Sequence, residues 1–172
     1  DMYVKYAKVC FERYKDLVKY WLTFNEIDSV FRHPFTTVGV VEDKYDSKKE
    51  AEEAIYQALH NQFVASALAT KYCHEIIPGS RVGCMVTKTL TYPETCNPDD
   101  IILAQRDNRN NFVYTDVQVL GKYPRHLLNY FKKNNINVKM LEGDEAILQQ
   151  YTVDFISFSY YMSMVQSINA AQ

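Results

Sequence analysis

The sequence lacks a long hydrophobic run, a cluster of cationic residues and a segment that resembles a secretion signal. No apolar run approaches the roughly 20 residues that a membrane-spanning helix needs, and the stretch from Asp1 to Lys5 does not read as a signal peptide. The formal net charge of −2 gives no support for binding to nucleic acid or to a membrane surface. A chain of 172 residues is still long enough to bury a core. We therefore expect a globular, cytoplasmic protein with no nucleic-acid or membrane partner.

The sequence also lacks the residue spacings of a metal site. It has four cysteines and four histidines, but no C-x-x-C pair occurs and no histidine stands at ligand spacing from a cysteine. Reduced, mostly buried thiols are typical of cytosolic proteins. We expect no metal ion and no cofactor.

Three apolar segments predict strands, and long helical segments separate them. The strands are expected near residues 19–25, 81–87 and 153–161. Ser47-Lys48-Lys49-Glu50 is a capping box that predicts a long helix ending before Pro78. Further helices are predicted from apolar spacing over residues 3–18, from Asn97-Pro98, from Pro124 and around residues 144–149, and residues 27–46 are expected to form a loop.

This alternation of strands and helices favours a parallel α/β sheet. Parallel strands need long crossovers, and both intervals between the predicted strands are long enough to contain helices. No repeat, low-complexity tract or linker divides the chain. Residues 1–172 are therefore expected to form one segment without an internal boundary.

The first predicted strand ends in Asn25-Glu26, a carboxamide beside a carboxylate. Parallel α/β folds place their chemistry at the carboxyl ends of strands, so these side chains are candidates for a site. The alternative is that Glu26 is simply the first solvated residue of a loop. Strict alternation sends Asn25 and Glu26 to opposite faces, so a shared site requires the strand to twist or bulge at its end.

The third predicted strand carries two different faces. Alternation puts Ile156, Phe158 and Tyr160 on a face suited to packing under helices, and the neighbouring polar residues on the other. Tyr161 lies on the polar face at the carboxyl end of the strand, where its hydroxyl would be near a site at that edge of the sheet. Without further information, a core tyrosine with one hydrogen bond is the favoured alternative.

Several of these segments resemble a known enzyme family. "YWLTFNEI" (20–27) resembles the fourth-strand motif of family 1 glycoside hydrolases, which are (β/α)8-barrel β-glycosidases. "VDFISFSYYMS" (153–163) is similar to the sixth strand, and "KYP" (122–124) fits the fifth crossover. The 41 residues from "HNQFVASAL" to "CNPDD" (60–100) are most similar to bacterial 6-phospho-β-glucosidases. The resemblance implies a partial TIM barrel, from about helix 3 to strand 6.

The resemblance also implies roles for three residues. Glu26 would be the general acid/base, which protonates the glycosidic oxygen and then deprotonates the hydrolytic water. Such a carboxyl group needs a raised pKa, and the hydrophobic strand is expected to aim and desolvate it. Asn25 would bind the sugar 2-hydroxyl, and Tyr161 would hold the nucleophile and lie near the ring oxygen of the sugar. Many members have asparagine where this chain has Ser159, and serine there resembles the 6-phospho-β-glucosidase branch.

Other parts of the family's site are missing from the sequence. A retaining mechanism needs a second carboxylate roughly 5 Å from the acid, and the family's E-N-G motif that carries it does not occur here. The loop that cradles the 6-phosphate is also missing. The resemblance therefore implies a central barrel fragment that is inactive alone and that self-associates through its open sheet edges.

The sequence is compatible with three hypotheses for the function. The first is a fragment of a retaining enzyme that acts on a phosphorylated β-glucoside. The second keeps this mechanism but changes the substrate to an unphosphorylated β-glucoside or a 6-phospho-β-galactoside. The third is a non-catalytic module that retains part of the barrel.

Overall fold

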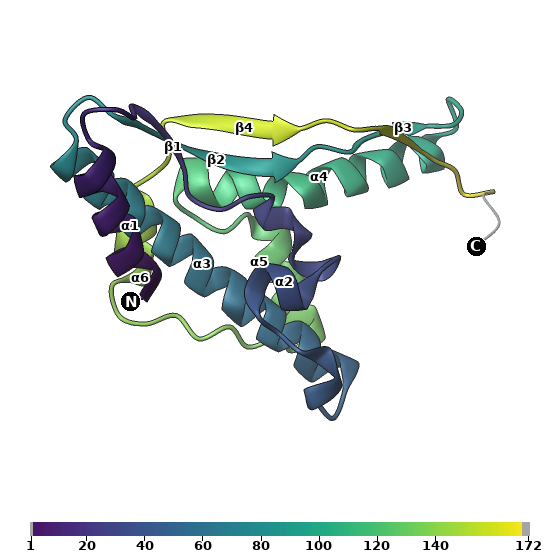
Figure 1. The fold of residues 1–172 in the computed structure, drawn as a ribbon. Helices are drawn as coiled ribbons and strands as arrows, with labels where there is room; N and C mark the ends of the chain where they lie inside the picture. The colour runs from purple at the N-terminus through teal and green to yellow at the C-terminus, as the bar shows by residue number, and fades with distance from the viewer. Residues whose placement is uncertain (1, 170–172) are drawn as a thin grey trace.

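The computed structural model describes residues 2–169, which form a parallel sheet with the helices gathered on one of its faces (Figure 1). The elements in chain order are α1 (Met2–Tyr14), β1 (Tyr20–Leu22), η1 (Ile27–Phe31), α2 (Pro34–Val38), η2 (Glu42–Lys44), α3 (Lys48–Ile76), β2 (Arg81–Thr87), β3 (Leu90–Pro93), α4 (Pro98–Leu120), α5 (Arg125–Asn134), α6 (Asp144–Gln150), β4 (Phe155–Ser159) and β5 (Ser163–Gln166).

The main sheet has the order β1-β2-β4, and both of its strand pairs are parallel. Helix α3 lies in the crossover from β1 to β2, whereas α4, α5 and α6 lie in the crossover from β2 to β4. The predicted parallel sheet with long helical crossovers is confirmed, and β2 has the predicted bounds. The other two strands are shorter than predicted. β1 ends at Leu22 because the next residue bonds to helices: Tyr3 of α1 donates to the Thr23 carbonyl oxygen, and the Thr23 and Ser66 hydroxyls lie 2.7 Å apart.

The helix starts follow their local capping signals. Ser47 Oγ accepts from the N–H of Glu50 at 3.2 Å, and Asn97 Oδ1 accepts from the N–H of Asp99 at 3.0 Å. The Glu50 carboxylate reaches back to the N–H of Asp46, one residue earlier than a capping box predicts. None of the helices in residues 2–169 is long and apolar enough to cross a membrane.

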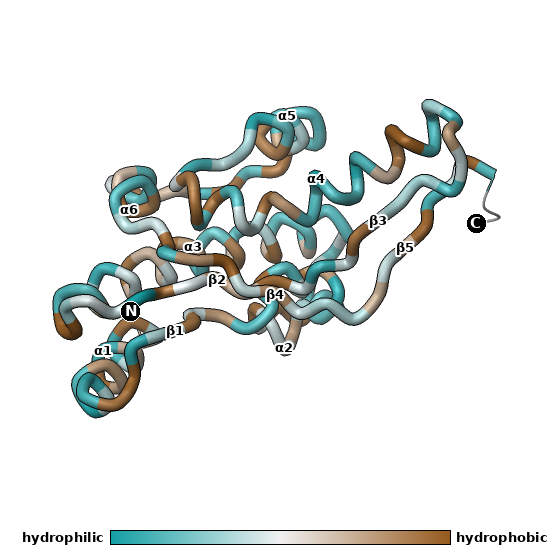
Figure 2. Tube along the Cα trace, turned by 90° about the horizontal axis from the view of Figure 1, so that it is seen from above, coloured by the Kyte–Doolittle hydropathy of each residue, from teal (hydrophilic) through white to brown (hydrophobic). Residues whose placement is uncertain are grey.

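A second, two-stranded parallel sheet was not predicted. β3 pairs with β5 beyond the carboxyl ends of β2 and β4 (Figure 2). Helix α4 holds this pair: the Asn108 carboxamide bonds both the N–H and the carbonyl oxygen of Thr91, and Gln166 donates to Asp107 at 2.7 Å. The predicted loop over residues 27–46 also contains three short helical turns, η1, α2 and η2.

The largest core cluster lies where α3 crosses the sheet. Ile55, Leu59 and Phe63 recur every four residues along α3 and pack near Val86 of β2 and Val117 of α4. Residues four apart share one face of a helix, so this stripe is continuous. The cluster holds the central strand against its two crossover helices.

The expectation that one face of the outer strand β4 packs under helices is wrong. The register pairs Cys84 with Ile156 and Val86 with Phe158, so these β4 side chains share the helix-facing side of the sheet. Ile156 is nevertheless 50% exposed and Phe158 is 60% exposed. Tyr160 is exposed as well. The face was assigned correctly, but no helix in residues 2–169 covers it.

Replacing Gly121 by alanine is expected to destabilise the chain by at least about 2 kcal/mol. Gly121 ends α4 with φ +66°, and a Cβ there would lie 2.5 Å from the Gln149 Cα and 2.6 Å from the Leu148 carbonyl oxygen. Urea unfolding measures the effect. Gly79→Ala is the matched control because Gly79 has φ +85° with no atom within 4 Å of a built Cβ. Equal losses for both variants would show that the contact with α6 costs nothing.

Asp154→Asn is expected to cost about 1–2 kcal/mol near neutral pH and almost nothing in acid. Burial raises the pKa of Asp154, but hydrogen bonds from the Val82 N–H (2.7 Å), His74 and Arg81, together with the charge of His74, outweigh it and leave the pKa lowered. A lowered folded-state pKa stabilises above the unfolded value of about 3.9 and is lost as the pH falls through the folded value.

Urea unfolding at several pH values checks this prediction. Asp16→Asn, at an exposed position with no side-chain hydrogen bond in residues 2–169, is the control. A stability difference for Asp154→Asn that persists unchanged in acid would contradict the assignment to the carboxylate.

Candidate active site

The candidate residues from two strands lie at the same edge of the sheet. β1, β2 and β4 run parallel, so their carboxyl ends share one edge. Asn25 and Glu26 follow β1 there, and Tyr161 follows β4 by two residues. Parallel α/β sheets bind ligands at this edge.

The backbone turns sharply at Glu26, four residues after β1 ends. Its dihedral angles are φ 47° and ψ 54°, in the left-handed region. In residues 2–169 the other non-glycine residue with positive φ is Asn135, and asparagine tolerates that conformation far better than glutamate. Such conformations cost about 1–3 kcal/mol and persist where the surrounding structure holds them. Because β1 ends at Leu22, Asn25 and Glu26 lie in the turn after the strand and strict alternation does not apply to them; a site that they share stays a prediction.

Ser29 holds the Glu26 backbone in place. Its N–H and its hydroxyl both donate to the Glu26 carbonyl oxygen, at 2.8 Å and 2.7 Å. The Ser29 hydroxyl also lies 2.9 Å from the Thr37 hydroxyl of α2. The Glu26 side chain is half-buried, and its carboxylate makes no hydrogen bond or ion pair within residues 2–169. The Glu26 backbone is thus anchored, while its carboxylate has no partner within the described residues.

A buried carboxylate beside this turn was missed in the sequence. Asp28 Oδ1 accepts from the N–H of Thr87 at 2.6 Å, and its Oδ2 accepts from Arg32 at 3.1 Å. Arg32 also donates to the Thr87 hydroxyl at 2.9 Å. These bonds tie η1 to the carboxyl end of β2. The signal in the sequence was the i,i+4 spacing of Asp28 and Arg32 directly after Glu26.

The same pair affects Tyr114 of α4. Burial raises the pKa of the Tyr114 phenol, the charge of Asp28 raises it further, and Arg32 opposes the rise. Tyr114 therefore stays protonated at neutral pH and packs as an uncharged group behind the turn.

Asn25 and Tyr161 are both exposed, and Tyr161 is 74% exposed. The alternative of a core tyrosine is therefore wrong. No hydrogen bond joins Tyr161 to Asn25 or Glu26 in the described part of the chain. Tyr20 and Leu22 of β1 are also exposed, at 65% and 47%, so this strand does not by itself desolvate the edge as expected.

Lys88, which follows β2, does not serve this edge. Its ammonium donates to the Asn108 and Asn111 side chains at 3.3 Å and 3.2 Å and lies 4.2 Å from the Phe112 ring centroid. Burial lowers the pKa of Lys88. Lys88 therefore ties β2 to α4 rather than presenting a charge at the site.

Comparison with known proteins identifies the segment. The sequence profile described as "Glycosyl hydrolase family 1" matches residues 1–172. The chain belongs to glycosyl hydrolase family 1. Aryl-phospho-beta-D-glucosidase BglH of Bacillus subtilis (strain 168) is 49% identical over 167 residues, which are 97% of this chain and 35% of that protein. A 6-phospho-beta-glucosidase of Clostridium longisporum is 48% identical over 161 residues, covering 94% of this chain and 33% of that protein. The chain thus spans about a third of the length of these family 1 relatives.

Solved structures of β-glucosidases share the fold. A beta-glucosidase from Exiguobacterium marinum superposes with a TM-score of 0.74 at 23% identity, covering 98% of this chain and 38% of that one. The family 1 enzyme from Thermotoga maritima also gives a TM-score of 0.74 at 23% identity, covering 98% and 37%. The predicted fold class, a partial (β/α)8 barrel, is confirmed.

Proposed function

We propose that this chain is the acid/base-bearing part of a retaining β-glycosidase that hydrolyses 6-phospho-β-glucosides to glucose 6-phosphate and an aglycone. The observation that carries the proposal is the position of Glu26 within a family 1 segment. It follows a parallel strand at the carboxyl edge, and its backbone is held in a conformation that glutamate rarely adopts. Strain of this kind gathers at functional sites.

In the proposed reaction Glu26 transfers a proton twice. It first protonates the glycosidic oxygen as the aglycone leaves and a glycosyl-enzyme forms. It then takes a proton from the water that hydrolyses this intermediate. Asn25 donates to the sugar 2-hydroxyl, an interaction that strengthens as the oxocarbenium-like transition state develops. Tyr161 holds the nucleophile and lies near the ring oxygen of the sugar.

The nucleophile comes from outside these 172 residues. The nearest carboxylate in the chain sequence, Asp28, has both oxygens committed to Thr87 and Arg32. It is therefore a structural group and not the second carboxylate, which must lie roughly 5 Å from the acid in a retaining enzyme. The isolated chain is inactive on this proposal.

The names of the relatives support the 6-phosphate in the proposed substrate. The relatives from Bacillus subtilis and Clostridium longisporum, which are 49% and 48% identical to this chain, are both named as phospho-β-glucosidases. A 6-phospho-beta-galactosidase of Clostridium acetobutylicum is only 30% identical over 171 residues. We place the protein in the cytoplasm, since its cysteines are all free thiols, as a reducing compartment favours.

A segment-swap enzyme tests this function. Residues 1–172 replace the matching segment of the Bacillus subtilis relative, and the product is assayed on p-nitrophenyl β-glucoside 6-phosphate. We expect kcat/KM within about tenfold of the unmodified relative. A folded segment-swap enzyme without activity would contradict the proposal, because the segment would then lack a working acid/base.

The chain alone provides the second test. It should not hydrolyse the same substrate, and its mass in solution should exceed that of one 20.1 kDa chain. The half-exposed apolar residues of β4, Ile156 and Phe158, favour this self-association. Saturable hydrolysis by the isolated chain would mean that a second carboxylate lies within the sequence.

A further inference from the structure

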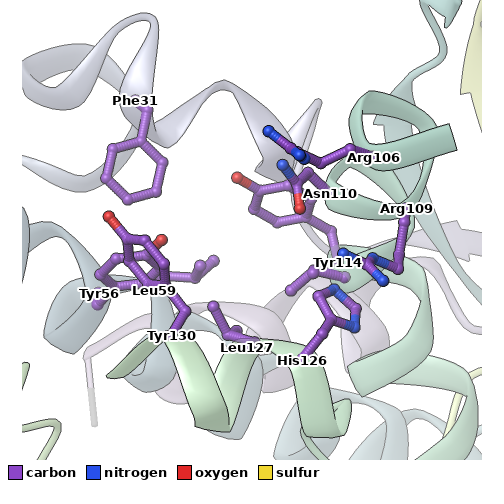
Figure 3. Close-up of a pocket in the computed structure, with 11 residues that line it drawn as sticks. Phe31, Tyr56, Leu59, Arg106, Arg109, Asn110, Tyr114, His126, Leu127 and Tyr130 are labelled. Carbon is purple, nitrogen blue, oxygen red and sulfur yellow. The ribbon is translucent and has the colours of Figure 1, made fainter. Parts of the chain in front are cut away.

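A pocket of about 460 Å³ lies among the helices, away from the exposed face of the sheet. Residues of η1, α3, α4 and α5 line it (Figure 3). These elements belong to the crossovers on either side of the central strand β2. In a complete barrel, further strands would pair with the edge strands β1 and β4. The pocket is lined by helical residues, so these additional strands would not fill it.

The pocket has two chemically different walls. Phe31, Tyr56 and Tyr130 form one side, and Arg106, Arg109 and His126 lie on the opposite side (Figure 3). The ring centroids of Phe31 and Tyr56 are 4.8 Å apart, edge to face, which makes a firm aromatic surface. The Tyr130 hydroxyl donates to Glu52 at 2.6 Å, and this bond, together with burial and the charge of Glu52, raises the pKa of Tyr130 to about 12. The aromatic wall is therefore uncharged.

The opposite wall carries two arginine side chains that form no ion pair within residues 2–169. Arg106 and Arg109 are three residues apart on α4, so their side chains are neighbours on the helix surface. Within residues 2–169, neither guanidinium has a carboxylate within 4.0 Å or a hydrogen bond. Burial lowers the pKa of the His126 imidazole, and the positive charge of Arg109 lowers it further. The negative charge of Asp116 has the opposite, weaker effect on this pKa.

His126 supplies an independent sign of an absent ligand atom. Its Nε2 is buried and has no hydrogen-bond partner in the described part of the chain. An unpaired buried polar nitrogen costs about 1–3 kcal/mol, so it is normally satisfied. His126 and Arg109 line the same pocket, so an acceptor oxygen bound there is a candidate partner for both side chains.

The geometry points to a binding site for a phosphate monoester that carries a ring, with the phosphate on Arg106, Arg109 and His126 and the ring against Phe31, Tyr56 and Tyr130. Two guanidinium groups match a doubly charged phosphate, since each can donate in bidentate fashion. The aromatic side chains bury an aryl group or the apolar face of a sugar. This site is separate from Glu26 and does not depend on hydrolysis.

Calorimetric titration of the 172-residue chain tests the site with phenyl phosphate, glucose 6-phosphate and inorganic phosphate. We expect at least one of the two ring-bearing esters to bind at least about tenfold more tightly than inorganic phosphate, the difference being burial of the ring. The tighter of the two shows whether the natural ring is an aryl group or a sugar. Binding should also shift the NMR signals of the His126 ring.

Three variants locate the binding. Arg106→Gln combined with Arg109→Gln is expected to weaken the tighter ester at least about tenfold. Arg13→Gln removes one exposed arginine of α1 and is expected to leave the affinity unchanged. Glu26→Gln is also expected to leave it unchanged, which separates this site from the proposed active site.

Four results would overturn the inference. One is the lack of saturable binding by either ester, and another is equal affinity for inorganic phosphate. Equal loss in the Arg13 variant would show attraction by general charge only. Loss in the Glu26 variant would place the ester at the carboxyl edge of the sheet. Circular dichroism confirms that each variant is folded before its affinity is compared.

Discussion

Glu26→Gln in the segment-swap enzyme is expected to lower kcat/KM for natural 6-phospho-β-glucosides by about 10²–10⁴. Glutamine keeps the shape of the side chain but cannot give up or take a proton. The backbone should remain in place, because Ser29 binds the Glu26 carbonyl oxygen and not the carboxylate. Initial rates on a phosphorylated disaccharide measure the loss.

The leaving group distinguishes an acid/base role of Glu26 from a purely structural one. A phenol of low pKa leaves without protonation, so the first step should survive in Glu26→Gln. The second step still needs a base to activate water. An activated aryl substrate should therefore give a burst of phenol followed by slow turnover.

Glu75→Gln is the matched control for this prediction. Glu75 is an exposed residue of α3 that pairs only loosely with Lys71, at 4.0 Å. Its replacement should leave all rates unchanged. Near-normal turnover of Glu26→Gln would remove Glu26 from its proposed role, and loss of the burst along with turnover would assign it to a different step.

Asp28→Ala is expected to destabilise the chain by about 3 kcal/mol. The Asp28 side chain is 1% exposed, and its loss leaves the N–H of Thr87 without an acceptor and Arg32 without its partner. Glu26 is the N-cap residue of η1, the short helix that contains Asp28. We therefore also expect kcat of the segment-swap enzyme to fall by at least about tenfold, since small displacements of a catalytic group are costly.

The variant Asp28→Asn separates the contribution of the hydrogen bond from that of the charge. Asp28→Asn keeps an oxygen for the N–H of Thr87 but loses the charge that pairs with Arg32. Its cost should be about half that of alanine. Urea unfolding measures both variants, and Asp16→Ala serves as an exposed control expected to stay within about 0.5 kcal/mol. Equal costs for alanine and asparagine would mean that the charge, and not the bond to Thr87, carries the stability.

The parts of the fold that depend on neighbouring residues could be predicted from the sequence. Ser47 and Asn97 cap their helices through bonds to residues two or three positions away, so the signal is contained in a few letters. The strand Arg81–Thr87 was recognised from its apolar run, and its parallel pairing from the length of the crossovers. The second sheet could not be foreseen, since Thr91 and Gln166 are held by side chains of α4.

The candidate site divides in the same way. Asn25, Glu26 and Tyr161 were selected from motifs, and their roles remain predictions. The hydrogen bond from Thr87 to Asp28 joins residues 59 positions apart, and no local pattern reports such a contact. The exposure of Ile156 and Phe158 also lies outside local patterns, because alternation assigns a face but not the element that covers it.

The sequence by itself determined the family, the parallel strands and the helix starts, because motifs, periodicity and capping depend on residues that are close together in the sequence. Only the tertiary structure decided the left-handed backbone at Glu26, the network of Asp28, Arg32 and Thr87, and the two-walled pocket between the crossover helices. The network and the pocket arise where segments distant in the chain meet, and the turn at Glu26 is held by Ser29, which itself contacts Thr37 of α2. Their hydrogen bonds and charges depend on distances that only the folded chain sets.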